Sequence, residues 1–403
     1  MARTLVASDY IAGDKAHFSV SYEFCRIICE CEDADLMVPS LDNAVERRFG
    51  RFLPAHDGHN VQRDFNRIVN AGRKCLGLRN GATIEHNSVR GEYELFVYVA
   101  WSPQSLVELS RLKHWRERSQ IKVLYLFELW VSTIESDARY LRILEEFDFV
   151  FLLHKAPMTR LASFTAAGLQ WLPPAVDCLV ASPVPAAPRR CIDVYSYGNR
   201  SAPVHQRLLE LSERGNLFYL YDSLSSTDSR VKNWYEHRLL IANAIKRSRY
   251  FIAFNPATLA GEKSSKIADE QVLASRLFEG AAGGAVILGS APQCAEFSEA
   301  FPWAEAVVEI NPDGTNIEKT IADLDAEPER VERLRATAIA GSLLRHDWVY
   351  RWEAVLSAVG LPPLHQLEQR KRRLSHLAEI AQKGSLQLGT PPEDRYACEA
   401  ATA

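Results

Sequence analysis

The stretch SRLFEGAAGGAVILG, residues 275–289, decides the fold class because it joins a helix directly to a strand. Leu277 and Ala281 lie one turn apart, on the expected inner face of the helix. The glycine pair at 283–284 ends the helix, and the apolar residues 285–289 follow as a strand. Helices that lead straight into buried strands are typical of parallel sheets with helices on both faces. The stretch therefore predicts an α/β fold.

Short apolar runs alternate with longer amphipathic stretches along most of the chain, which indicates strands separated by helices. The expected strands form two groups, Thr4–Ser8, Leu36–Pro39, Leu95–Trp101, Val123–Leu129 and Phe147–His154, then Ile192–Tyr197, Leu217–Asp222, Tyr250–Asn255, Ala285–Gly289 and Ala306–Ile310. We therefore expect two Rossmann-like domains that face one another across a cleft. Ligands of such sheets bind outside the carboxyl ends of the strands.

The length of 403 residues also favours two domains, since single cores usually stop growing at about 250–300 residues. Repeated prolines at 181–190 favour extended chain and predict the linker. The first domain is then 1–180 and the second 191–345. A helix is expected at 346–362, and residues 363–403 should form a short charged helix and a frayed tail.

Composition narrows the class of protein. A net charge of −4 and scattered basic residues make nucleic acid an unfavourable partner. The apolar run near the N-terminus reaches Asp9 too early for a signal peptide, and no run approaches the ~20 residues of a membrane span. Cys25, Cys29 and Cys31 have no second ligand pair at zinc-finger spacing, so we interpret them as reduced core thiols. We expect a cytoplasmic protein.

A turn after the expected strand at 192–197 could bind phosphate. Gly198 permits close backbone approach, the helix after Asn199 begins with unpaired N–H groups, and Arg200 can pair with a diphosphate. The same pattern also suits an ordinary strand-to-helix turn with a surface arginine. The glycine fingerprint G-x-G-x-x-G is absent here, which argues against a standard dinucleotide fold.

A second basic segment follows the strand that ends at Asn255. Lys263 and Lys266 flank a serine pair, Ser264 and Ser265, either of which can cap a helix that continues through Leu277. Positive side chains beside a helix N-terminus favour an anion.

Three polar residues of the same helix fall within reach of one another. Ser275 and Arg276 lie four and three positions before Glu279, so a carboxylate there can accept both hydroxyls of a ribose. The alternative is an exposed ion pair that contributes only a few tenths of a kcal/mol. The small residues after Glu279 favour the first interpretation, because they let a ligand approach closely.

Residues 275–289, with the upstream Asn255-Pro256, resemble the C-terminal donor-binding domain of GT-B-fold glycosyltransferases of the bacterial "glycosyl transferases group 1" type. The sequence HDWVYRW at 346–352 is similar to the final helix of this family, which crosses back to the first domain. For the N-terminal half the resemblance rests on architecture alone. The resemblance implies that Glu279 binds ribose and that Gly198, Asn199 and Arg200 lie at the diphosphate.

The resemblance also implies the reaction. The expected activity is transfer of a hexosyl group from a nucleoside diphosphate sugar to a hydroxyl of a saccharide or glycoconjugate. A UDP-sugar or a GDP-sugar is the expected donor. No metal and no cofactor beyond this co-substrate are expected, and no Asp-x-Asp follows an expected strand. Many retaining members carry a glutamate where this chain has Gln271, with Glu270 one position away, so the stereochemical outcome stays open. Many relatives build surface polysaccharides, so peripheral membrane association also stays open.

Candidates for the acceptor side lie just beyond strand ends of the first domain. Asp14 and His17 are the preferred candidates for deprotonating an acceptor, because a carboxylate or an imidazole can take up a proton. The further acceptor-side candidates are Glu128, Trp130 and His154. Arg238, before the helix expected from 239, is a weaker donor-side candidate at the cleft edge. Each residue also suits a cap or turn role.

Two other classes share parts of this pattern. A two-lobed solute-binding protein also closes two Rossmann-like domains on a small ligand, but such proteins are exported and this chain lacks a signal peptide and carries eight cysteines. A nicotinamide-dependent oxidoreductase would need the missing glycine fingerprint.

Overall fold

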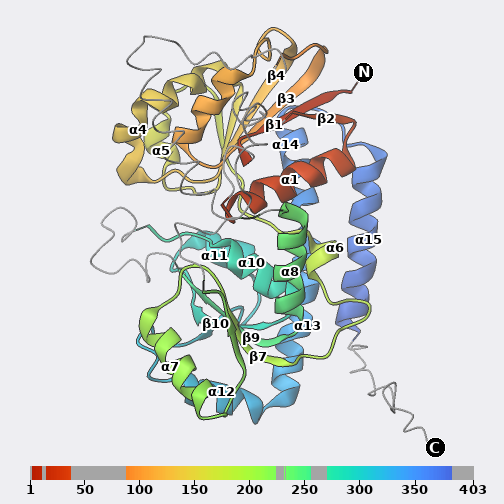
Figure 1. The fold of residues 1–403 in the computed structure, drawn as a ribbon. Helices are drawn as coiled ribbons and strands as arrows, with labels where there is room; N and C mark the ends of the chain where they lie inside the picture. Colours follow the sequence, from red (N-terminus) through yellow and green to blue (C-terminus); the bar gives the residue numbers. More distant parts are fainter. Residues whose placement is uncertain are drawn as a thin grey trace, which may run out of the picture.

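The computed structural model describes residues 2–10, 15–37, 88–223, 231, 233–255 and 270–383. It contains two parallel sheets, one in each half of the chain, with helices packed around both (Figure 1). This arrangement confirms the predicted α/β class with two Rossmann-like domains.

The first sheet has six strands in the order β2-β1-β3-β4-β5-β6. The strands are β1 Thr4–Ser8, β2 Ala34–Met37, β3 Tyr93–Ala100, β4 Ser119–Leu126, β5 Phe149–Leu152 and β6 Gly168–Trp171. Every pairing is parallel, so all carboxyl ends meet at one edge. The sequence did not predict β6, because this short edge strand begins with a glycine and is only partly buried.

The second sheet has five strands in the order β11-β10-β9-β7-β8. Its strands are β7 Ile192–Ser196, β8 Tyr219–Tyr221, β9 Ser248–Phe254, β10 Val286–Ser290 and β11 Val308–Glu309. All five expected strands are present, each within a few residues of its predicted bounds. Residues 182–191, which contain neither helix nor strand, connect the two sheets.

The described helices are α1 Phe18–Cys31, η4 Pro103–Arg111, η5 Val131–Thr133, α4 Ile134–Leu141, η6 Arg142–Glu146, α5 Met158–Leu161, α6 Cys178–Ala181, α7 Ala202–Glu213, α8 Trp234–Lys246, α10 Ser275–Gly283, α11 Ala295–Ala300, α12 Ile317–Asp325, α13 Pro328–Arg345, α14 Trp348–Ala358 and α15 His365–Gln382. The helix predicted to begin at Ser264 or Ser265 and to continue through Leu277 was wrong for residues 270–274. Residues 270–274 are not helical, and α10 begins at Ser275 without a side-chain cap. The two serines themselves lie outside the described residues.

The last two helices bind the halves together. Trp348 of α14 packs on Phe24 of α1, with ring centroids 4.9 Å apart. The long helix α15 contacts both α1 and α13, and Figure 1 shows it along the side of both halves. It is longer than the short helix expected near the C-terminus. One cluster of buried apolar side chains, which includes Phe24, Phe278 and Trp348, therefore runs through both halves.

Candidate functional site

The turn Tyr197–Arg200, called the donor-side turn below, leads from the carboxyl end of β7 into α7. Gly198 has a left-handed φ of +68°, which a residue with a Cβ rarely adopts. Ser201 caps α7, because its side chain accepts a hydrogen bond from the backbone N–H of Val204. The sequence therefore fixes a tight turn at the position where α/β folds bind phosphate.

Both predicted phosphate-binding groups of this turn converge on one carboxylate. The N–H of Gly198 donates to Asp222 Oδ2 at 2.8 Å, and Arg200 Nη2 lies 3.2 Å from Asp222 Oδ1. Arg200 also donates to the Asp222 carbonyl oxygen at 2.7 Å. The turn thus binds an anionic oxygen pair in this structure. Asp222 was not among the predicted site residues, although its place directly beyond β8 was the available signal.

Arg276 supports the donor-side turn from the first turn of α10. Its Nη1 donates to the carbonyl oxygens of Tyr197, at 3.0 Å, and Asn199. Burial lowers the pKa of Arg276. The guanidinium therefore holds the turn in shape and places positive charge beneath Gly198. Ser275, at the start of α10, is only partly buried.

Glu279 is buried, so the alternative interpretation as an exposed ion pair is wrong. Only 2% of the residue is exposed, and one carboxylate oxygen accepts a hydrogen bond from the hydroxyl of Tyr197. The other oxygen accepts Nη1 of Arg238 at 2.5 Å. Arg276 and Glu279 are nevertheless brought together, since both contact Tyr197. The ribose-binding role of Glu279 stays a prediction.

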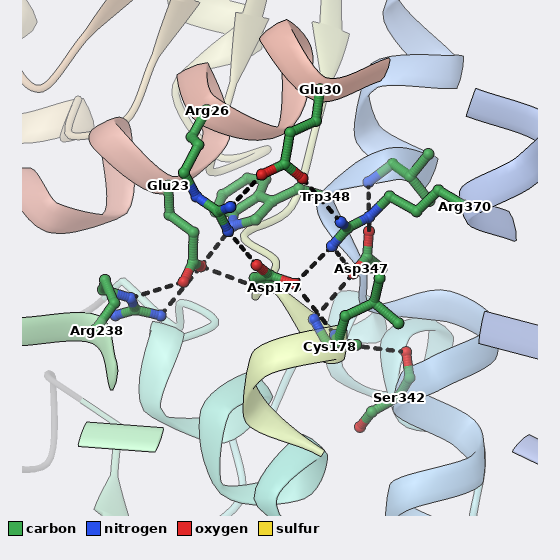
Figure 2. Close-up of polar contacts among 12 residues, drawn as sticks. Glu23, Arg26, Glu30, Asp177, Cys178, Arg238, Ser342, Asp347, Trp348 and Arg370 are labelled. Atoms are coloured by element: carbon green, nitrogen blue, oxygen red, sulfur yellow. Dashed lines mark hydrogen bonds and ion pairs between the residues drawn. The ribbon is translucent and has the colours of Figure 1, made fainter. Parts of the chain in front are cut away.

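Arg238 does not lie at an open cleft edge or on the surface. It is 6% exposed and donates through Nε and Nη2 to Glu23 of α1, at 2.9 and 3.1 Å. Burial alone would lower the pKa of Arg238, but the carboxylates of Glu23 and Glu279 raise it. Arg238 therefore joins the two domains through ion pairs (Figure 2).

Gln271, which replaces the glutamate of many retaining relatives, cross-links two strand ends. Its Oε1 accepts two hydrogen bonds. One comes from the side-chain amide of Asn255, just after β9, and the other from the backbone N–H of Gln293, at 3.0 Å. The neighbouring Glu270 accepts the backbone N–H of Val131, in the first domain, at 2.9 Å. Asn255 thus lies at the expected edge of the sheet. Lys263 and Lys266 lie outside the described residues.

Five side chains near the carboxyl ends of first-domain strands form a second group, called the acceptor-side cluster below. It consists of His17, Trp101, Glu128, Trp130 and His154. The His17 and Trp101 rings lie 4.5 Å apart, and Trp101 Nε1 donates to Glu128 Oε2 at 2.9 Å. The Trp130 and His154 rings stack at 5.1 Å. Asp14, the other preferred candidate, lies outside the described residues.

Trp101 is the residue of this cluster that sequence reasoning missed. It directly follows β3, as Glu128 and His154 follow β4 and β5, and this position was the available signal. Its backbone N–H donates to Asp9 Oδ2 at 3.0 Å, and burial raises the pKa of Asp9 to about 6. Asp9 therefore fixes the backbone that presents the indole.

Burial also sets the protonation states of the acceptor-side cluster. It lowers the pKa of His17 and of His154 to about 4, so both imidazoles are neutral at pH 7. It raises the pKa of Glu128, against the opposing effect of the hydrogen bond from Trp101. Neutral imidazoles and a carboxylate of raised pKa can each accept a proton from a hydroxyl group.

Two contacts connect the donor and acceptor sides directly. Glu270 of the second domain meets Val131, the residue after Trp130, and Lys155 Nζ lies 3.0 Å from Glu299 Oε2. The carboxyl ends of the two sheets therefore approach one another, which is where a ligand of two Rossmann-like domains would lie. Among the described residues no group of three or more histidine, cysteine or acidic side chains is placed to hold a metal ion.

Comparison with known proteins agrees with this geometry. Residues 207–357 match the family described as glycosyl transferase-like. No curated protein sequence matches the chain. Within the described residues, no helix has the length and apolar character needed to span a membrane.

Solved structures of glycosyltransferases are similar to this chain in fold. An alpha-glucosyltransferase in complex with UDP aligns with a TM-score of 0.51 at 8% identity, over 89% of this chain and 100% of its own. The same enzyme with UDP and a 13-mer DNA containing an HMU base aligns with a TM-score of 0.52 at 8% identity, over 89% and 99%. HepE of Anabaena, in complex with UDP and glucose, aligns with a TM-score of 0.50 at 10% identity, over 89% and 99%.

Proposed function

Because residues 207–357 match the glycosyl transferase-like family and the chain has the fold of GT-B glycosyltransferases, we propose that it moves a sugar from a nucleoside diphosphate sugar to a hydroxyl group of an acceptor. The second domain would hold the donor and the first domain the acceptor. The observation that carries the proposal is the donor-side turn, where a backbone N–H and Arg200 together bind an anionic oxygen pair.

The donor diphosphate would take the place of Asp222 at this turn. Arg200, the Gly198 N–H and the N-terminus of α7 would then stabilise the charge that develops on the leaving diphosphate. These groups provide positive charge without a metal ion, which supports metal-independent transfer. The similar solved structures contain UDP, so a UDP-sugar is the favoured donor, with a GDP-sugar as the second choice.

The acceptor would be a saccharide or a glycoconjugate bound at the acceptor-side cluster. Trp101 and Trp130 would offer aromatic faces to a sugar ring, and Glu128, which accepts a hydrogen bond from Trp101, would bind its hydroxyl groups. The similar alpha-glucosyltransferase was also solved with DNA, but the net charge of −4 gives this chain no general attraction to phosphate backbones. A glycan acceptor is therefore proposed rather than a nucleic acid.

Release of UDP from UDP-glucose, UDP-galactose and UDP-N-acetylglucosamine, measured with mixed oligosaccharides and with duplex DNA, would test this function. Transfer to an oligosaccharide supports the proposal. Transfer to DNA alone would contradict the acceptor class, and sugar binding without turnover would favour a two-lobed binding protein.

Glu128→Gln is expected to lower kcat by about 100-fold or more, because general-base assistance contributes about 10²–10⁴-fold and the amide cannot take up the acceptor proton. The Kd for UDP should not change, since Glu128 lies in the other domain from the donor-side turn. Steady-state kinetics and calorimetry measure the two quantities. Glu135→Gln, on exposed α4, is the matched control. Equal kcat values in Glu128→Gln and the parent protein would remove Glu128 from the mechanism.

A further inference from the structure

Arg238 contacts one carboxylate from each domain. Its Nε and Nη2 face Glu23 of α1, and its Nη1 faces Glu279 of α10. Arg238 itself belongs to α8 of the second domain, so the pair with Glu23 crosses the domain boundary (Figure 2). A guanidinium with both ends occupied cannot rotate toward one carboxylate without leaving the other.

We infer that Arg238 is a positioning residue through which the first domain controls how Glu279 meets the donor. This inference rests on the proposed function and on the predicted role of Glu279 in binding the ribose of the donor. It adds that the affinity for the donor depends on Glu23, a residue of the opposite domain.

The position of Glu23 is itself fixed by several partners. Its Oε2 accepts the N–H of Asp177, at 3.0 Å, and the indole N–H of Trp348, at 2.8 Å, as well as Nη2 of Arg238. Asp177 caps α6, which leads into the linker, and Trp348 begins α14. Glu23 of the first domain therefore contacts both connections between the domains, the linker side through Asp177 and α14 through Trp348.

Loss of the Glu23 charge should change the geometry at Glu279. Arg238 would then have one carboxylate left, and guanidinium groups favour two parallel bonds to a carboxylate. A bidentate pair would turn Glu279 toward Arg238 and away from Tyr197, so both oxygens would be less available to ribose hydroxyls. Weaker donor binding follows, although Glu23 does not touch the donor.

A second buried arginine of the same region provides a matched control. Arg370 of α15 donates to Asp347 through Nε and Nη2, both at 2.8 Å, and to Asp177 at 2.6 Å. Within the described residues its ion pairs are with Glu30, Asp177 and Asp347, and not with Glu23 or Glu279. Figure 2 shows Arg370 paired with Asp177 and Asp347, so a substitution there perturbs the same interdomain region without removing a direct partner of Glu23 or Arg238.

The experiment is calorimetric titration of UDP and GDP into the parent protein and into Glu23→Gln, Glu279→Gln, the double variant and Arg370→Lys. Glu23→Gln should weaken nucleotide binding by about tenfold, a typical coupling between separate sites, and raise the donor KM while the acceptor KM stays constant. In the Glu279→Gln background, Glu23→Gln should add little further loss. Arg370→Lys should lower Tm and leave nucleotide affinity unchanged.

The outcomes distinguish failure of the proposed function from failure of the inference about Arg238. If the parent protein binds neither UDP nor GDP, the proposed function fails and the inference fails with it. Nucleotide binding by the parent with an unchanged affinity in Glu23→Gln overturns the inference alone. Equal losses of affinity in Glu23→Gln and Arg370→Lys also overturn it, because the effect would then reflect general destabilisation.

Discussion

Arg370→Ala is expected to lower the free energy of unfolding by about 3–5 kcal/mol, the cost of breaking a buried ion pair from one side. The substitution leaves the carboxylate of Asp347, which is 0% exposed, without the guanidinium that pairs with it, whereas Asp177 keeps its ion pair with Arg26. Asp347 retains hydrogen bonds from the backbone N–H groups of Cys178 and Val349, which do not neutralise its charge.

This substitution should also loosen the contact between the domains. Arg370 joins α15 to the N-caps of α6 and α14, and α15 packs on both α1 and α13. Urea unfolding of the variant measures the loss. Lys371 lies on the same helix as Arg370, and Lys371→Ala, which removes a partly exposed pair with Glu353 of α14, should cost less than about 1 kcal/mol. Similar losses in the two variants would contradict the importance given to the buried pair.

Arg200→Ala is expected to weaken UDP binding by about 10- to 100-fold, because hydrogen bonds to charged groups contribute roughly 1.5–3 kcal/mol. In this structure the guanidinium lies against the carboxylate and carbonyl of Asp222, at the position proposed for the diphosphate. The fold should persist, since Arg200 lies in a turn and its side chain is 18% exposed.

Calorimetry with UDP checks this expectation, with Arg207→Ala as the control. Arg207 lies on α7, seven positions further along the chain, and pairs with Glu210 and Glu318 at the surface. UDP affinities that agree between Arg200→Ala and the parent protein would place the diphosphate elsewhere.

Local patterns predicted most of the architecture. The helix and strand at 275–289 and the turn at Gly198 follow from spacing, glycine positions and apolar runs, which act over a few residues. The start of α10 could not be predicted in the same way, since Ala274 provides no capping side chain. The edge strand β6 lacks the continuous apolar run that marked the central strands.

Long-range contacts at the candidate site could not be predicted from spacing. Arg238 pairs with Glu23, 215 positions earlier in the chain, and with Glu279, 41 positions later. Helical spacing placed Arg276 and Glu279 together but did not show that one supports the donor-side turn while the other is buried against Arg238. Trp101 was missed because its place in the acceptor-side cluster depends on a hydrogen bond to Glu128, which lies just beyond the next strand.

The most direct test of the central claim is a calorimetric and thermal-shift screen of the purified protein against UDP, GDP, dTDP, CDP, ADP and their sugar conjugates, with NADH and free sugars as contrasts. We expect selective binding of one nucleoside diphosphate, with UDP favoured, and loss of that binding in Arg200→Ala. Stabilisation by free sugars or NADH, together with no response to any nucleoside diphosphate, would contradict it.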